Sequence, residues 1–191
     1  MVTSPRIRIA LSAACATALA LATPIVEASP ANAADTITAA DQPYFAYYHL
    51  DQARAKGYTG KGVTVAIIDG KVDTAANELN GATVTDKTPC TVTVTPESTG
   101  HGTGTASILV ARDYGVVPDA TLLAYQTDAG DADPGSDCTG IGGINLAGYP
   151  SLINHAINDG AQIINLSAGS SDHSNELRWA IARAIHQGIL I

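Results

Sequence analysis

Basic side chains are scarce in this sequence: 10 Lys and Arg stand against 18 Asp and Glu, for a formal net charge of -8. Binding to the phosphates of a nucleic acid needs clustered cations, so we expect no nucleic acid partner. The composition is otherwise ordinary, with 46% hydrophobic and 15% charged residues, no long biased tract and no internal repeat. These features predict a globular protein with a single domain.

No charged residue occurs between Ile9 and Val26, near the start of the chain. Arg6 and Arg8 precede this stretch, and the small residues Ala31-Asn32-Ala33 follow it. A cationic start, an apolar stretch and a small-residue end are the features of a secretory signal peptide. We therefore expect residues 1–33 to be cleaved off after Ala33 and the mature protein to be secreted.

A membrane anchor of similar length is the alternative interpretation of this N-terminal segment. The segment is rich in Ala and Thr rather than Leu, and it contains Pro24. Both features are poor for a helix that spans a membrane, so we expect no stable membrane anchor.

Cysteine is also rare. Of the three cysteines, Cys15 lies in the expected signal peptide, which leaves Cys90 and Cys138 for the mature protein. Disulfides persist in secreted proteins, so we expect these two residues to be bridged. Two unpaired thiols are the alternative, because two cysteines alone have no diagnostic spacing.

The order of segments after the signal peptide is typical of an α/β fold. Residues 34–61 are a polar, Tyr-containing arm, and from Val63 onward short β-branched runs alternate with helical patterns. This alternation predicts three layers, with a mostly parallel sheet flanked by helices. The expected strands are 63–68, 120–125, 162–166 and one that begins at 189, and the expected helices are 101–113, 151–158 and one that ends before Gly188. The inward faces of the last two helices are expected to carry Leu152, Ile153, Ala156 and Ile157, and Leu177, Ile181, Ala184 and Ile185.

Asp69 and His101 are the candidate catalytic residues. Asp69 follows the first expected strand, and in open α/β sheets ligands gather outside the carboxyl ends of the strands. His101 stands in Gly100-His101-Gly102-Thr103-Gly104, where we expect it to open a helix and to lie at the helix N-terminus. Alone, Asp69 could be a turn residue and His101 a structural histidine. Their occurrence together in these two settings favours a catalytic pair.

Three segments, in this order, resemble the subtilisin-like serine proteases, the subtilase or peptidase S8 family. Residues 65–73, Val-Ala-Ile-Ile-Asp-Gly-Lys-Val-Asp, are similar to the family's aspartate segment, and residues 101–107, His-Gly-Thr-Gly-Thr-Ala-Ser, to its histidine segment. Residues 163–169, Ile-Ile-Asn-Leu-Ser-Ala-Gly, resemble the strand and glycine that line its substrate cleft. The catalytic triad of this family runs Asp, His, Ser along the chain.

The resemblance implies an endopeptidase that acts on peptide or protein substrates. His101 would be the general base for the catalytic serine, and Asp69 would fix the tautomer of its imidazole. An extended substrate would bind as an added β-strand, to backbone groups of Ser167, Ala168 and Gly169. Gly140 to Gly143 would form the opposite wall of the cleft. Such an activity requires no cofactor, and this sequence has no feature that supports a structural calcium site.

The sequence also departs from the family pattern. Gly70 stands where the family usually has Thr or Ser, Lys71 where it has Gly, and Gly104 where it often has a second His. The oxyanion-hole Asn and the nucleophilic Ser of the family have no counterpart up to Ile191. We therefore expect residues 62–191 to be the N-terminal portion of a catalytic domain, incomplete at the C-terminus and inactive by itself.

Three other functions agree with parts of the sequence. A nucleotide-binding α/β domain is disfavoured because Gly57, Gly60 and Gly62 precede the first strand, whereas a phosphate-binding loop follows a strand. A protein that binds peptides without cleaving them stays open as an alternative. Metal binding is disfavoured because no second ligand lies at ligand spacing from His49, His155, His173 or His186.

Overall fold

The computed structural model describes residues 37–128, 136–167 and 173–191. The chain divides into two units, Met1–Asp35 and Thr36–Ile191, and the described residues all belong to the second. The expected signal peptide, residues 1–33, lies outside the described residues, as do Ala168 and Gly169 of the expected substrate cleft. Within the described ranges, no helix is both long enough and apolar enough to cross a membrane.

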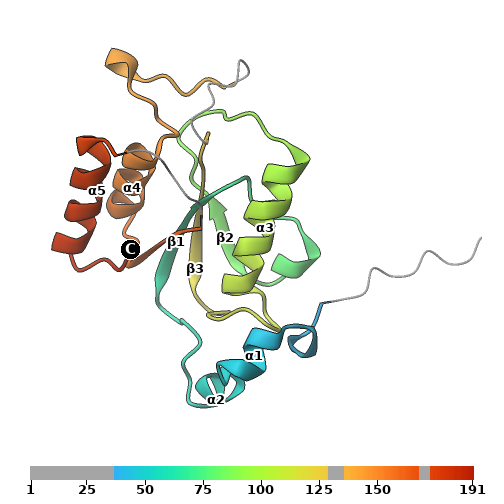
Figure 1. Cartoon of the computed structure of the whole chain (residues 1–191). Helices are drawn as coiled ribbons and strands as arrows, with labels where there is room; N and C mark the ends of the chain where they lie inside the picture. The colour runs from blue at the N-terminus through green and yellow to red at the C-terminus, as the bar shows by residue number, and fades with distance from the viewer. Residues whose placement is uncertain (1–36, 129–135, 168–172) are drawn as a thin grey trace, which may run out of the picture. The chain divides into compact units, whose positions relative to one another are not determined.

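A parallel sheet lies at the centre of the unit Thr36–Ile191 (Figure 1). Among the described residues it has four strands in the spatial order β2-β3-β1-β4, and their bounds are β1 Thr64–Asp69, β2 Thr83–Asp86, β3 Thr121–Gln126 and β4 Ile163–Leu166. β1 pairs with β3 on one side and with β4 on the other, and it is buried from Val65 to Asp69. A central parallel strand is covered on both faces, which explains its continuous apolar sequence.

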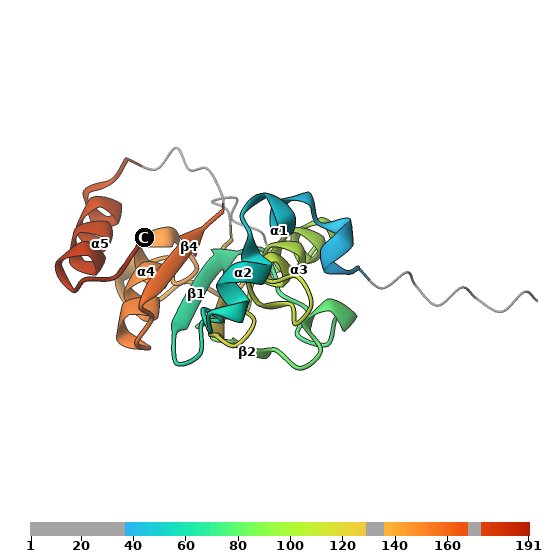
Figure 2. The same cartoon turned by 90° about the horizontal axis from the view of Figure 1, so that it is seen from below.

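Helices cover both faces of this sheet (Figures 1 and 2). Helix α3 packs on one face and helices α4 and α5 on the other, and their bounds are α3 Pro96–Val110, α4 Tyr149–Asn158 and α5 Asn175–His186. Successive residues of β1 point to the two layers: Ile67 packs in the core on the side of α3, and Ile68 in the core on the side of α4 and α5. The prediction of a three-layer α/β fold with a parallel sheet is confirmed.

The inward faces of the last two helices differ in how well the sequence predicts them. All four residues expected on the inner face of α4 are buried. For α5 the prediction is wrong at Ile185, which is 62% exposed, while Ala180 is buried. Leu177, Ala180, Ile181 and Ala184 are spaced three and four residues apart and form one stripe on the helix. Ile185 lies outside that stripe.

The two edges of the sheet differ in how well the sequence predicts them. The sequence pattern does not predict β2, because Thr83–Asp86 is short and only Val84 in it is partly buried against the core. At the other edge, Leu190 forms a parallel bridge with Ile163 of β4. The strand that the sequence predicts from residue 189 is therefore represented by this single bridge at Leu190.

The arm before β1 is helical and tied to the loop that follows α3. It contains a 3-10 helix and two short α-helices, with bounds η1 Ala39–Asp41, α1 Pro43–Tyr47 and α2 Leu50–Ala55. The guanidinium group of Arg54 donates hydrogen bonds to the backbone carbonyls of Arg112, Asp113 and Gly115. The planar guanidinium carries several donors in a fixed geometry, so a single arm residue satisfies three loop carbonyls.

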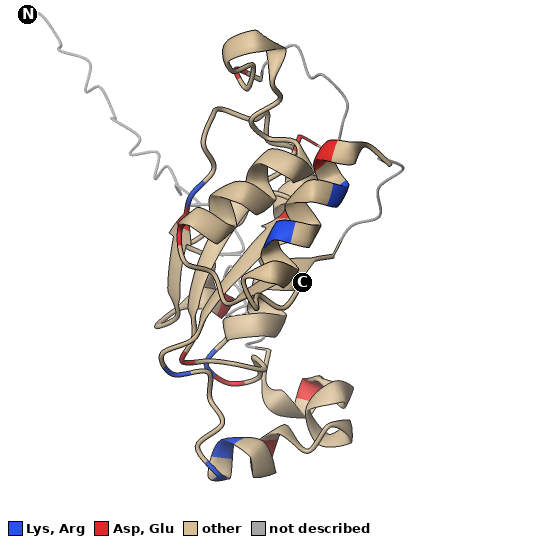
Figure 3. Ribbon diagram, turned by 90° about the vertical axis from the view of Figure 1, so that its left-hand side faces the viewer, with Lys and Arg blue, Asp and Glu red and all other residues tan. Residues whose placement is uncertain are grey.

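Several basic side chains outside the arm are paired with carboxylates. The pairs are Lys71 with Asp86, Lys87 with Asp159 and Arg112 with Asp119. On the face turned to the viewer in Figure 3, basic residues occur singly or in pairs rather than as a continuous patch.

Candidate active site

Asp69 lies where β1 ends, at the carboxyl edge of the sheet. It is 2% exposed and lies in register with Gln126, the last residue of β3. The backbone N–H of Thr127 donates to the carbonyl of Asp69 at 2.9 Å, which continues the pairing of the two strands to this point. The carboxylate is thus fixed on a rigid element at the edge where parallel α/β sheets bind ligands.

His101 is carried by α3, but not at its start. The prediction that His101 opens the helix is wrong: α3 begins at Pro96, so the imidazole lies in the second turn. Thr95 caps the helix, because its hydroxyl accepts a hydrogen bond from the Ser98 N–H at 3.0 Å, and proline is well suited to the first helical position. The glycines around His101 suggest a helix boundary, whereas the capping residue Thr95 stands six residues before His101.

The structure brings Asp69 and His101 together. Nδ1 of His101 and Oδ1 of Asp69 are 2.5 Å apart, and the same oxygen accepts from the Gly70 N–H at 2.6 Å. An ionised carboxylate can only accept hydrogen bonds, so this contact favours the neutral tautomer in which Nδ1 carries the proton and Nε2 has a free lone pair. The Asp69 side chain is 2% exposed and the His101 side chain is 58% exposed. A buried carboxylate beside an accessible imidazole is an arrangement that can serve general-base chemistry.

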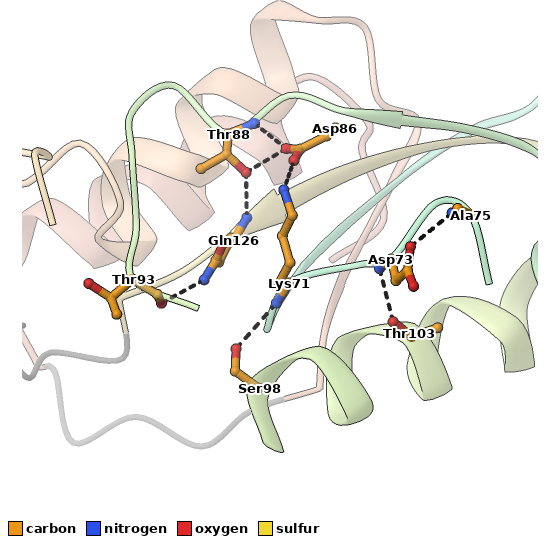
Figure 4. A network of polar contacts seen from close by, with 9 residues as sticks. All are labelled: Lys71, Asp73, Ala75, Asp86, Thr88, Thr93, Ser98, Thr103 and Gln126. Carbon is orange, nitrogen blue, oxygen red and sulfur yellow. Dashed lines mark hydrogen bonds and ion pairs between the residues drawn. The ribbon is translucent and has the colours of Figure 1, made fainter. Parts of the chain in front are cut away.

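Two hydrogen bonds join α3 to the turn that follows Asp69 (Figure 4). The Lys71 N–H donates to the Ser98 hydroxyl at 3.3 Å, and the Asp73 N–H donates to the Thr103 hydroxyl at 2.9 Å. Both acceptors are on α3 within three residues of His101. The turn and the helix are therefore fastened to each other on both sides of the imidazole.

Two glycines allow this close approach. A Cβ atom on Gly70 would lie 2.2 Å from the carbonyl oxygen of Ser98, and one on Gly102 would lie 2.4 Å from the carbonyl oxygen of Gly70. The departure of Gly70 from the family's Thr or Ser thus has a steric reason, because α3 leaves no room for a side chain there. A Cβ on Gly104 would meet nothing within 4 Å, so the departure at that position has no steric cause.

Gly102→Ala and Gly104→Ala therefore form a matched pair with opposite expected effects. We expect Gly102→Ala to lower the free energy of unfolding by about 3 kcal/mol, because the added methyl group meets backbone that cannot rotate away. Gly104→Ala, two residues further along the helix and on its exposed side, should raise it by roughly 0.5 to 1 kcal/mol. Urea unfolding of the two variants measures both values, and equal stability of the two variants would contradict the close packing of α3 on the Asp69 turn.

The residues expected to bind substrate backbone are only partly described. Ser167 follows β4 directly and is exposed, and its hydroxyl accepts a hydrogen bond from the Asn165 side chain at 2.6 Å. Ala168 and Gly169 lie outside the described residues. The expected opposite wall, Gly140 to Gly143, contains the short helix η3 Ile141–Gly143, with Ile141 97% exposed.

Tyr149 belongs to the neighbourhood of the pair and is missed by the sequence analysis. Burial raises the pKa of its hydroxyl, and the negative charges of Asp69 and Asp128 raise it further. The expected helix begins at Ser151, whereas α4 begins at Tyr149 with Pro150 in its first turn. The segment Gly148-Tyr149-Pro150 is the signal that could have placed this tyrosine at the start of a helix.

Cys90 and Cys138 are joined by a disulfide, with their Cα atoms 5.1 Å apart. The bridge ties the segment after β2, which leads into α3, to the segment after β3, which leads into α4. Val92, Cys138 and Ala147 are buried together around it, and Cys90 packs against them. The bridge thus fixes the loop through which the chain reaches the helix that carries His101.

Opening this disulfide should lower the free energy of unfolding by about 3 to 4 kcal/mol, because the closed loop spans a sequence separation of 48 residues and its constraint on the unfolded chain is lost. Urea unfolding of the mature protein with and without reductant measures the difference. A Cys90→Ser/Cys138→Ser variant should match the reduced protein and should not respond to reductant. A midpoint that reduction leaves unchanged would contradict the bridge.

The described residues contain no group of three or more His, Cys, Asp or Glu side chains that could hold a metal ion. His155 and His186, two of the histidines considered for metal binding, lie on the separate helices α4 and α5.

The sequence is similar to known proteases over most of its length. The subtilase family matches residues 60–191. The chain is 30% identical over 147 residues to the major intracellular serine protease of Bacillus subtilis (strain 168), covering 72% of this chain and 43% of that protein. It is 35% identical over 154 residues to the minor extracellular protease Vpr of the same organism, covering 73% of this chain and 18% of that protein.

The fold is also found in solved structures of proteases. The serine protease MycP1, an essential component of the type VII (ESX-1) secretion system, superposes with a TM-score of 0.55 at 26% identity, covering 82% of this chain and 47% of MycP1. The prenylagaramide maturation protease PagA superposes with a TM-score of 0.54 at 25% identity, covering 74% of this chain and 48% of PagA. The chain spans less than half the length of each of these relatives. The family match covers more than half of the chain, and the fold agrees with that of the two solved proteases. The chain therefore belongs to the subtilase family of serine proteases.

Proposed function

We propose that this chain supplies the aspartate and the histidine of the catalytic triad in a secreted serine endopeptidase. The observation that carries the proposal is the contact of His101 Nδ1 with Asp69 Oδ1 at 2.5 Å, at the carboxyl edge of the sheet. A buried carboxylate on one nitrogen and an accessible second nitrogen are what a general base for a serine hydroxyl needs.

In the proposed reaction, Nε2 of His101 removes the proton of the serine hydroxyl as the oxygen attacks the peptide carbonyl. The imidazolium then donates this proton to the leaving amine, and Asp69 stabilises the imidazolium in between. The substrate is a protein or peptide that lies extended beside the chain after β4, where Ser167, Ala168 and Gly169 offer backbone groups. The serine comes from outside the described residues, within which no serine hydroxyl is hydrogen-bonded to His101.

Secretion is part of the proposal and rests on the N-terminal segment. The arginines, the uncharged stretch and the small residues before Ala34 support export and cleavage. Relatives of the chain include proteases named as intracellular and as extracellular, so family membership alone does not choose between these locations.

The test uses the gene product that the organism itself releases. An antibody against residues 37–61 collects it from culture medium, and a fluorophosphonate reagent, which reacts with activated serines, is then added. We expect labelling and casein hydrolysis, and we expect His101→Ala in the chromosomal gene to abolish both. His186→Ala is the matched control, because His186 is an exposed histidine at the end of α5.

Two results would refute the proposal. Collected protein that neither reacts with the reagent nor hydrolyses casein would favour a peptide-binding protein without catalysis. Absence of the protein from the medium, together with its presence in the cells, would refute secretion.

A further inference from the structure

Lys71 and Asp86 form an ion pair at the carboxyl edge of the sheet (Figure 4). Lys71 comes two residues after Asp69, and Asp86 is the last residue of β2. β1 and β2 are not neighbours, because β3 lies between them. The ion pair therefore connects the turn after Asp69 to a strand two positions away in the sheet.

A chain of hydrogen bonds continues from this ion pair toward α3. Thr88 donates from its N–H and its hydroxyl to Oδ1 of Asp86, at 2.9 and 2.7 Å. The Gln126 N–H donates to the Thr88 hydroxyl at 2.9 Å, and the Gln126 side chain donates to the Thr93 carbonyl at 3.1 Å. Gln126 is 4% exposed and stands in register with Asp69. Through Gln126 the network reaches the residue that lies in register with Asp69, and it ends at Thr93 in the loop that enters α3.

Lys71 takes part in this network through both its backbone and its side chain. Its backbone N–H binds Ser98 on α3, and its ammonium group binds Asp86. Burial raises the pKa of the Asp86 carboxyl, but hydrogen bonds from Lys71 and Thr88 and the ammonium charge outweigh burial and lower it below the ordinary value. The carboxylate is therefore charged at neutral pH, and both side chains are only about one third exposed.

We propose that Lys71 is a positioning residue, whose ion pair with Asp86 fixes the turn after Asp69 and so holds the Asp69 carboxylate against Nδ1 of His101. The inference rests on the proposed function, because it assigns a role toward that acid–base pair. Glycine, which the family has at this position, cannot make the ion pair. In this chain the side chain of Lys71 restrains a turn that a glycine would leave freer.

The experiment measures the tautomer of His101 in the folded mature protein by NMR. The ¹⁵N chemical shifts of the neutral imidazole give the ratio of the Nδ1–H form to the Nε2–H form, and Asp69 favours the Nδ1–H form by accepting its hydrogen bond. We expect the Nδ1–H form to dominate in the parent protein. In Lys71→Met the ratio should fall about threefold to fivefold, the change that an ion pair of this exposure supports.

Three further variants separate positioning from general stability. Asp86→Asn should lower the ratio as Lys71→Met does, and Lys71→Arg should restore it because the ion pair is kept. Arg112→Met is the matched control, since it removes the ion pair with Asp119 in the segment after the C-terminal end of α3, where the side chains are 50% and 35% exposed. It should lower stability without changing the tautomer ratio.

The outcomes distinguish this inference from the proposed function. A parent protein in which the Nε2–H form dominates would refute the Asp69–His101 pair and with it the proposed function. The Nδ1–H form could instead dominate in the parent protein and keep the same ratio in Lys71→Met and Asp86→Asn. That result would overturn the role of Lys71 and leave the proposed function standing. Ile67 and Leu122 are two buried strand residues whose amide signals report on the sheet. Loss of these signals in Lys71→Met and Asp86→Asn would also overturn the positioning role, because the ion pair would then support the whole sheet.

Discussion

The purified 191-residue polypeptide, cleaved after Ala33, is expected to hydrolyse casein or peptides no faster than its His101→Ala variant. Removing the nucleophile from a catalytic triad costs on the order of 10⁶ in turnover, because the three residues act as a unit. Loss of an oxyanion-hole donor costs a further factor of roughly 10² to 10³. We therefore propose that the triad of this protein needs a serine and an oxyanion donor from outside the described residues.

Three serines of the described residues, Ser98, Ser107 and Ser167, have hydroxyl groups that are hydrogen-bonded to groups other than His101. The hydroxyl of Ser98 accepts from the Lys71 N–H, and that of Ser107 donates to the Gly104 carbonyl at 2.7 Å. The hydroxyl of Ser167 accepts from Asn165. None of these three is held by His101, so none is activated as a nucleophile. Rapid hydrolysis by the polypeptide that His101→Ala abolishes would show that the nucleophile has been placed wrongly.

The sequence predicts β1 and the position of Asp69 at its end well, because both follow from local chemistry. A central strand buried on both faces requires a continuous apolar run, and Asp69-Gly70 interrupts that run where the strand ends. The inner face of α4 is equally predictable from the three- and four-residue spacing of Leu152, Ile153, Ala156 and Ile157.

The sequence fails to predict local structure where a tertiary contact determines that structure. The start of α3 is misplaced because Gly100 and Gly102 suggest a boundary, yet Gly102 is a helical residue that must be small so that α3 can approach Gly70. The edge strand β2 has too few buried residues to produce a pattern. The pairing of Lys71 with Asp86 depends on the order β2-β3-β1 in space, which the sequence of a single chain does not display.

Asp69→Asn in the secreted gene product is expected to lower kcat by about 10⁴, because an amide no longer fixes the Nδ1–H tautomer or stabilises the imidazolium. The side chain is nearly isosteric and 2% exposed, so the fold should persist and the loss should appear in kcat rather than in protein yield. Asp113→Asn, an exposed aspartate in the loop after α3, is the matched control and should leave kcat unchanged.

The measurement that tests the catalytic pair most directly is therefore the steady-state hydrolysis of a fluorogenic peptide by the parent and these two variants, each collected from culture medium. We predict a kcat for Asp69→Asn about 10⁴ below the parent and a kcat for Asp113→Asn equal to it. A kcat for Asp69→Asn equal to that of the parent would contradict the assignment of Asp69 and His101 as the acid–base pair.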